Sequence, residues 1–247
     1  MSGDERAPHA TDLNDPASLA TGELEVLGAL PDSSNAALLV RCHGPAGPVI
    51  AVYKPMRGEA PLWDFPDGTL HRREVAAFEL SRALGWPNIP ATVLRDGPFG
   101  VGAVQRFIRF DPAEHFFTME AERADVFRRV ALFDLVANNA DRKGGHCLLG
   151  DDGEVWMIDH GLCFLAEPKL RTVIWSFIGE PVPADAAEDV RRVATDLTGG
   201  GPLTEAFRAL LDAEEIDTTR RRAEEVATLD AFPEPDPETR PFPWPPI

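Results

Sequence analysis

Short runs of alternating apolar and polar residues, separated by turns, occupy the first part of the chain. Residues 22–28, 37–43 and 49–53 alternate as half-buried strands do. Residues 30–36 and 44–48, which lie between these runs, are rich in Gly, Pro and small polar residues, the usual composition of turns. The pattern predicts an antiparallel meander of three strands.

A second pair of apolar runs, residues 91–95 and 101–108, flanks an Asp-Gly turn and predicts a hairpin. Residues 71–85 have the pattern of a helix that stops at a glycine, whereas residues 56–70 contain Pro, Gly and Trp and are expected to form a loop. Up to the end of this hairpin, the chain therefore predicts a sheet of about five strands with one inserted helix.

Helical patterns dominate the second part of the chain. Residues 120–138 and 185–228 are expected to be helical, the latter with a break at residues 198–202. The expected fold class is α+β with two lobes, a sheet lobe and a mainly helical lobe that carries a hairpin. The chain then divides into a disordered start (1–19), the sheet lobe (20–110), the helical lobe (111–230) and a proline-rich tail that is extended or disordered and outside the core (231–247).

The centre of the chain combines a helix end, a polar loop and a tight hairpin. Residues 147–149 and 155–158 are apolar runs too short for helices, and the Asp-Gly between them favours a hairpin turn. A hairpin brings its two ends to within about 5 Å, so His146 at its entry and Asp159 at its exit should lie close together. With Asp141 on the preceding loop, two carboxylates and one imidazole are predicted to converge where a metal ion and a reacting group could sit.

Net charge narrows the possible partners. The chain carries 41 acidic and 24 basic residues, a formal net charge of -17. Anionic nucleic acids and anionic membrane surfaces should repel such a chain, so we expect no nucleic-acid partner and no association with membranes. The three cysteines form no disulfide or metal-binding spacing, and no apolar run approaches the ~20 residues of a transmembrane helix, so a cytoplasmic protein is expected.

A lysine and a glutamate of the first lobe are candidates for a charged pair. Glu74 shares a helix face with apolar or small residues, where an unpaired acid would be costly to bury, and Lys54 at a strand end is the nearest candidate partner. Two simpler interpretations stay open. Lys54 could be an ordinary solvated lysine. Glu74 could have no role beyond a favourable interaction of its negative charge with the helix dipole in the first turn.

Together with the central hairpin, this pair suits phosphoryl transfer, which needs phosphates held, their charge neutralised and a nucleophile placed in line. Lys54, steered by Glu74, would hold the α- and β-phosphates of ATP. Asp159 would ligate Mg²⁺, which prefers oxygen ligands, and Asp141 would orient the acceptor hydroxyl and accept its proton. Further nucleotide contacts are expected from a turn and from a hinge at the end of the last strand of the sheet: Ser33, Ser34, Asn35, Gln105, Phe107 and Ile108.

The chain resembles the phosphatidylinositol 3-/4-kinase-like superfamily, in particular the type II phosphatidylinositol 4-kinases and their small bacterial, including actinobacterial, relatives. The matching motifs occur in the same order: Ser-Ser-Asn (33–35), Val-Tyr-Lys-Pro (52–55), Arg-Glu-Val-Ala (73–76), Gln-Arg-Phe-Ile (105–108), Asn-Ala-Asp-Arg (139–142) and Ile-Asp-His-Gly-Leu (158–162). The resemblance implies a two-lobed protein-kinase-like fold, ATP and a divalent metal. It places the nucleotide-binding lysine at Lys54, its partner at Glu74, the catalytic aspartate at Asp141 and the metal-binding aspartate at Asp159.

One position departs from the family pattern. Where relatives usually have an asparagine that binds a second metal, this chain has His146, and an imidazole suits Mn²⁺ or other transition metals better than Mg²⁺. His146 could bind metal, meet a phosphate as an imidazolium, or cap the hairpin. Arg142 and Lys143 could neutralise the γ-phosphate or lie in a solvated loop.

The sequence leaves three possible sources of the acceptor hydroxyl: a protein, a small molecule or a lipid. Residues 162–183, which follow the metal-binding aspartate, are expected to hold it. The sequence predicts an active kinase. The alternatives are a nucleotide-binding pseudokinase with a regulatory role, and a kinase-like fold that transfers AMP.

Overall fold

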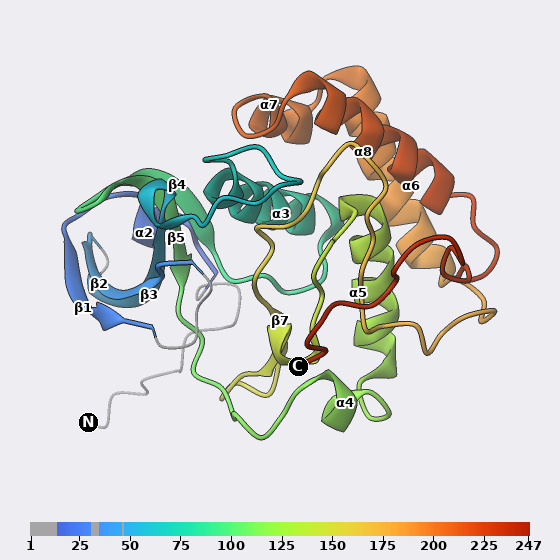
Figure 1. Ribbon diagram of the computed structural model, residues 1–247, viewed down its shortest axis with the longest axis horizontal. Helices are drawn as coiled ribbons and strands as arrows, with labels where there is room; N and C mark the ends of the chain where they lie inside the picture. The colour runs from blue at the N-terminus through green and yellow to red at the C-terminus, as the bar shows by residue number, and fades with distance from the viewer. Residues whose placement is uncertain (1–13, 31–34, 46) are drawn as a thin grey trace, which may run out of the picture.

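The chain forms two lobes, an N-terminal sheet with one long helix and a C-terminal part built mainly of helices (Figure 1). The structure is a computed structural model, and it describes residues 14–30, 35–45 and 47–247. A largely continuous apolar core runs from the inner face of the sheet, under the long helix, into the helical lobe. The predicted α+β organisation is confirmed.

The N-terminal sheet is antiparallel, with the strand order β1-β2-β3-β5-β4. Its strands are β1 (Leu24–Ala29), β2 (Leu38–Gly44), β3 (Gly47–Pro55), β4 (Thr92–Gly97) and β5 (Gly100–Arg106). The predicted meander and hairpin are both present. The structure adds that β5, and not β4, pairs with β3, so the end of β3 is held in the middle of the sheet.

The long helix α3 (Leu70–Leu84) connects β3 to β4 after a short turn of 3₁₀ helix, η1 (Met56–Gly58). It buries Val75, Phe78 and Leu80 toward the sheet and the neighbouring helices. The helix ends as predicted at Gly85, whose φ of 87° lies in the left-handed region that glycine adopts without strain.

The start of the described chain differs from the prediction. At the end of the segment expected to be disordered (1–19), the short helix α2 (Ala17–Ala20) begins, and Leu19 is fully buried against the sheet. Asn14 attaches this segment to the chain just before β4, because its side chain donates to Ile89 O and accepts from Ala91 N. One apolar side chain and one bridging amide order residues whose composition alone favours disorder.

The C-terminal lobe is arranged around α5, with the small hairpin on one side (Figure 1). Its elements are α4 (Phe116–Met119), α5 (Ala124–Ala137), η2 (Gly144–His146), β6 (Cys147–Leu149), β7 (Val155–Met157), α6 (Ala184–Gly199), α7 (Pro202–Arg208) and α8 (Ala213–Val226). The predicted helices and their break at residues 198–202 are confirmed. An additional break precedes α8, where Asp212 and Glu215 cap the helix reciprocally.

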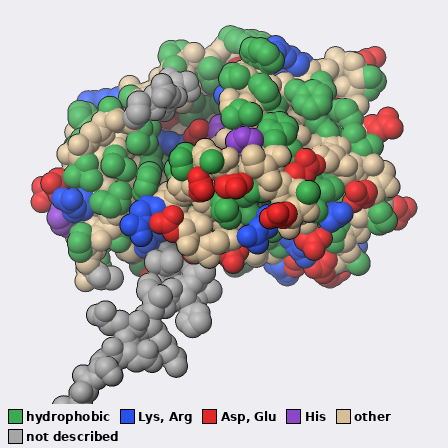
Figure 2. Space-filling view, turned by 90° about the horizontal axis from the view of Figure 1, so that it is seen from below, with side chains coloured by type: hydrophobic (Ala, Val, Ile, Leu, Met, Phe, Trp, Pro, Cys, Tyr) green, Lys and Arg blue, Asp and Glu red, His purple; other side chains and the backbone are tan. Residues whose placement is uncertain are grey.

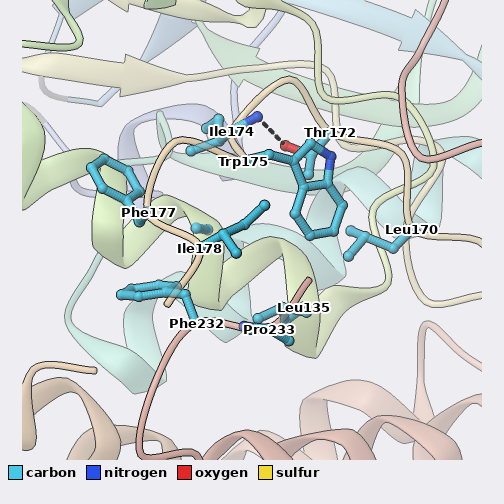
Figure 3. Close-up of a pocket in the computed structure, with 10 residues that line it drawn as sticks. Leu135, Leu170, Thr172, Ile174, Trp175, Phe177, Ile178, Phe232 and Pro233 are labelled. Carbon is cyan, nitrogen blue, oxygen red and sulfur yellow. Dashed lines mark hydrogen bonds between the residues drawn. The ribbon is translucent and has the colours of Figure 1, made fainter. Parts of the chain in front are cut away.

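The proline-rich tail is extended but packed, which corrects its expected place outside the core. Phe232 is buried, and its ring lies 5.8 Å from that of Phe177. Figure 3 shows Phe232 and Pro233 beside Leu135 and Ile178 in a small apolar pocket. The tail is therefore attached to the helical lobe by the burial of one large aromatic side chain.

Acidic and basic side chains are mixed over the face shown in Figure 2, without a broad area of either charge. Within the described residues, none of the helices is both long enough and apolar enough to cross a membrane.

Candidate active site

Lys54 occupies the next-to-last position of β3, on the opposite sheet face from the buried side chains of Tyr53 and Pro55. Its Nζ donates to Glu74 Oε1 at 2.5 Å and to Asp159 Oδ1 at 2.6 Å. Burial alone lowers the pKa of this ammonium, but the two carboxylates outweigh that effect and raise it. Lys54 is therefore a charged, paired group, and the interpretation as a solvated lysine does not hold.

Glu74 joins the first lobe to the loop that follows the hairpin. It lies beyond the first turn of α3, which contains no acidic residue, and its side chain is only 5% exposed. One carboxylate oxygen accepts from Lys54, and the other accepts from the backbone N–H of His160 at 3.1 Å. A role limited to the helix dipole is therefore wrong, because Glu74 is a buried acceptor for two specific donors.

The hairpin brings its entry and exit together as predicted. Ile158 N donates to His146 O at 3.0 Å, and His146 Nε2 lies 3.5 Å from Asp159 Oδ2. Asp159 has a φ of 60°, in the left-handed region, which is costly for a residue with a side chain and is often found at functional sites. The Lys54 ammonium holds the pKa of Asp159 well below its usual range. Burial raises this pKa, but the effect of the ammonium is stronger.

His146 lies beside Asp159 with 12% of its side chain exposed. Burial lowers its pKa to about 4, although the Asp159 carboxylate opposes that shift. The imidazole is therefore neutral near pH 7, which disfavours an imidazolium that meets a phosphate. Its Nδ1 also accepts from the backbone N–H of Lys143 at 3.4 Å, so the ring caps the short turn η2 while Nε2 faces Asp159.

Asp141 lies on the loop between α5 and the hairpin. Its carboxylate is 3.3 Å from Lys143 Nζ, and its backbone N–H donates to Asn139 Oδ1 at 3.0 Å. Burial raises the pKa of Asp141, and the charge of Asp159 adds to this, while the Lys143 ammonium opposes it. Lys143 is therefore not a solvated loop residue but the counter-charge of Asp141.

These side chains share one cavity of about 500 Å³ between the two lobes. The cavity is lined by acids and bases from both lobes, among them Lys54, Glu74, Asp141, His146 and Asp159. The predicted Asn35 also lines it, and Asn35 Oδ1 accepts from Ala60 N at 2.7 Å.

Arg142 lies outside this group. Its side chain is fully buried below the loop and forms an ion pair with Asp134, also fully buried, at 3.0 Å. The same guanidinium donates to Ile158 O at 3.2 Å and lies 2.8 Å from His160 Nε2. Asp134 in turn accepts from Thr172 Oγ1. The predicted direct catalytic contact is thus not supported by this placement, which instead ties the two acidic loops to α5.

The predicted nucleotide contacts are only partly brought together. Ser33 and Ser34 lie outside the described residues. The side chain of Gln105 is buried and donates to Thr92 Oγ1, and the backbone N–H of Phe107 extends the sheet by donating to Ile50 O at 3.0 Å. Neither residue, nor Ile108, is among the residues that line the cavity.

Two residues that the sequence did not single out also line the cavity. Glu59 Oε1 lies 2.6 Å from His71 Nδ1, and the Glu59 carboxylate accepts from the backbone N–H groups of Leu70 and His71, which caps α3. Burial opposes ionisation of Glu59, but these hydrogen bonds outweigh it and lower its pKa. The sequence signal for Glu59 was weak, an acid in the loop before a helix.

Asp134, the buried partner of Arg142, was also not singled out from the sequence. Its signal was clearer, because it is a lone acid in an apolar helical run.

The fold is two-lobed and kinase-like. The crystal structure of the proinflammatory kinase CtkA of Helicobacter pylori is similar to this fold, with a TM-score of 0.53 and 10% sequence identity. The match covers 86% of this chain and 94% of the CtkA chain. At that identity the match supports the fold alone, and it confirms the predicted kinase-like fold class. A golgi casein kinase matches 85% of this chain and 74% of its own, with 14% identity and a TM-score of 0.46, which is too low to add to the argument.

The chain belongs to the same family as the protein Rv2133c of Mycobacterium tuberculosis. The two are 40% identical over 265 aligned residues, which cover 92% of this chain and 93% of that protein. No family model matches the sequence.

Proposed function

We propose that the protein is an ATP-dependent phosphotransferase of the phosphatidylinositol 3-/4-kinase-like superfamily, which transfers the γ-phosphate of ATP to a hydroxyl acceptor. The observation that carries the proposal is the position of Lys54 between Glu74 and Asp159, beside Asp141, on one cavity between the lobes. A lysine held by two carboxylates from different lobes is suited to bind phosphate oxygens next to a metal-binding acid.

Each charged side chain has a role in this proposal. Lys54 neutralises charge on the α- and β-phosphates, and Glu74 keeps its ammonium in position. Asp141 lies on the loop with its carboxylate paired to Lys143, and it accepts the proton of the acceptor hydroxyl. Its raised pKa brings it closer to the pH at which a general base works best.

The donor chemistry of Asp159 and His146 fits a divalent ion. Among the described residues, no three His, Cys, Asp or Glu side chains are grouped closely enough to hold an ion by themselves. This is typical of Mg²⁺ and Mn²⁺ in phosphoryl transfer, which are held by one or two side chains together with the phosphates and water. When bound, such an ion would neutralise phosphate charge. The neutral imidazole of His146 suits Mn²⁺ better than Mg²⁺.

Arg142 has a positioning role in this account. Its guanidinium, held by Asp134, donates to the backbone carbonyl just before Asp159. The catalytic loop and the metal-binding loop are therefore attached to one buried ion pair. We retain residues 20–110 and 111–230 as the nucleotide-binding and catalytic lobes, and residues 162–183 as part of the acceptor side.

Incubation with ATP labelled at either the γ- or the α-phosphate, in Mg²⁺ and in Mn²⁺, tests the proposal. We expect release or transfer of the γ-label only, and its loss in Asp159→Ala. Asp151→Ala on the exposed hairpin turn is the matched control and should keep full activity. Transfer of the α-label would support AMP transfer, and ATP binding without turnover in either metal would support a pseudokinase.

A further inference from the structure

The tail returns to the cavity after its attachment at Phe232. Pro241 O accepts from the backbone N–H of Thr172 at 3.0 Å and from Trp175 Nε1 at 3.2 Å. Farther along, Pro246 O accepts from the backbone N–H of Gly144 at 2.8 Å. The segment of residues 241–247 is thus attached at both ends to the helical lobe.

The donors that hold this segment belong to the proposed catalytic machinery. Gly144 follows Asp141 on the same loop, and Thr172 lies in the segment expected to hold the acceptor. The two stretches are joined directly, because Arg142 N donates to Arg171 O at 2.9 Å and Val173 N donates to Arg142 O at 3.1 Å. Residues 241–247 therefore lie along the edge where the catalytic loop meets the acceptor segment.

The end of the segment reaches the cavity itself. Pro245 and Ile247 line it together with Lys54, Asp141, Lys143 and Asp159. Residues 241–247 read Pro-Phe-Pro-Trp-Pro-Pro-Ile and contain no Ser, Thr or Tyr. The segment consequently occupies the acceptor side of the cavity without offering a hydroxyl group.

Recognition of the segment is mainly through its backbone. Phe242 and Trp244 are 50% and 77% exposed, whereas Pro243 between them is buried. Prolines favour an extended chain whose carbonyl groups are free to accept, because the residue has no N–H of its own. Another extended polypeptide could therefore accept from the same donors, as in other modes of peptide recognition.

The charges of the cavity do not favour an anionic lipid headgroup. Among the described residues that line it, both lysines are already paired, Lys54 with Glu74 and Asp159, and Lys143 with Asp141. No further lysine or arginine lines the cavity within the described chain to receive a second phosphate group. A neutral peptide backbone has no such requirement.

We propose that residues 241–247 occupy the acceptor subsite and restrain the enzyme, and that the acceptor is an extended polypeptide which takes their place. This rests on the proposed function. In the reaction, the Ser or Thr oxygen of that polypeptide bonds to the γ-phosphorus of ATP while the bond from this phosphorus to the β–γ bridging oxygen breaks. The hydroxyl proton passes to Asp141, and ADP leaves.

The test compares the full chain with a variant that lacks residues 241–247, using γ-labelled ATP, Mn²⁺ or Mg²⁺ and a mixture of Ser- and Thr-containing peptides. We expect the shortened protein to label peptide at least tenfold faster. A synthetic peptide of residues 237–247 should suppress this activity in competition with the acceptor peptide and not with ATP. Equal rates in both proteins, or a slower shortened protein, would overturn the proposal.

A full-chain variant guards against misfolding of the shortened protein. Pro245→Glu/Ile247→Glu places two acids next to Asp141 and Asp159 and should release the segment by repulsion, with the same gain in peptide labelling and an unchanged thermal unfolding midpoint. Transfer to phosphatidylinositol vesicles, but not to peptides, would contradict a polypeptide acceptor. Absence of turnover in all three proteins would contradict the proposed function itself, whereas equal turnover in all three contradicts only the role of the tail.

Discussion

The Lys54 ammonium lies 2.6 Å from the Asp159 carboxylate, although 105 residues separate the two positions in the chain. Lys54 comes from the sheet lobe and Asp159 from the loop that follows the hairpin of the helical lobe. Glu74, 2.5 Å from the same ammonium, holds this contact from α3. The pair lies on the cavity that the two lobes share.

Replacement of Lys54 should separate catalysis from stability. We expect Lys54→Met to lower ATP turnover by about 100-fold, the effect of removing one preorganised charge-stabilising group. The same change leaves Glu74 buried without its cation, so the free energy of unfolding should also fall. Urea unfolding monitored by circular dichroism measures this.

The double variant Lys54→Met/Glu74→Gln provides the control for that prediction. It removes the buried unpaired charge, so stability should recover in part while turnover stays low. Recovery of turnover together with stability would show that Lys54 supports only the fold.

The pH dependence of turnover should report on Asp141. A general base must be ionised, and burial raises the pKa of Asp141, so the rate should fall on the acid side at a pH above the ordinary aspartate pKa of about 3.9. Lys143 lowers that pKa, so Lys143→Met should move the acid limb of kcat/KM to higher pH. Arg109→Met, at an exposed pair, should leave the profile unchanged. A shift to lower pH in Lys143→Met would contradict the assignment.

Metal preference should depend on His146. We expect His146→Asn, which restores the amide oxygen typical of the resembled family, to raise the ratio of turnover in Mg²⁺ to turnover in Mn²⁺. Comparison of initial rates over a range of each metal measures this ratio. The exposed His43→Asn is the control. An unchanged ratio would restrict His146 to capping the turn before the hairpin.

The buried pair of Asp134 and Arg142 should be a strong determinant of stability. Arg142→Met leaves the Asp134 carboxylate buried without a counter-charge, and we expect a loss of about 3–5 kcal/mol in the free energy of unfolding. Arg142→Met/Asp134→Leu should recover part of this loss. The exposed pair of Arg208 and Glu205 is the matched comparison, and Arg208→Met should have little measurable effect. A similarly small effect of Arg142→Met would contradict the positioning role.

Much of the architecture could be predicted because its signals are local. The strand that carries Lys54 and the helix that carries Glu74 follow from alternation and helical periodicity, and the Asp-Gly turn set the hairpin that brings His146 to Asp159. These contacts required only the correct elements in the correct order.

Burial that depends on tertiary packing could not be predicted in the same way. Arg142 lies in a polar loop, and only its position against Asp134 shows that it is buried. The packing of Leu19 and Phe232 corrects two segments whose composition favours disorder, because one buried apolar side chain can order a short stretch. The place of residues 241–247 on the cavity depends on the backbone donors of Gly144 and Thr172, which leave no pattern in the sequence.

The most direct test of phosphotransfer at this cavity is the conversion of ATP to ADP by wild-type protein and by Asp159→Asn, purified in parallel and assayed in Mn²⁺ and in Mg²⁺. The account predicts metal-dependent ADP formation by the wild type and its loss in Asp159→Asn, which retains the shape of the side chain but not its charge. Equal ADP formation by both proteins, or none by the wild type in either metal, would contradict it.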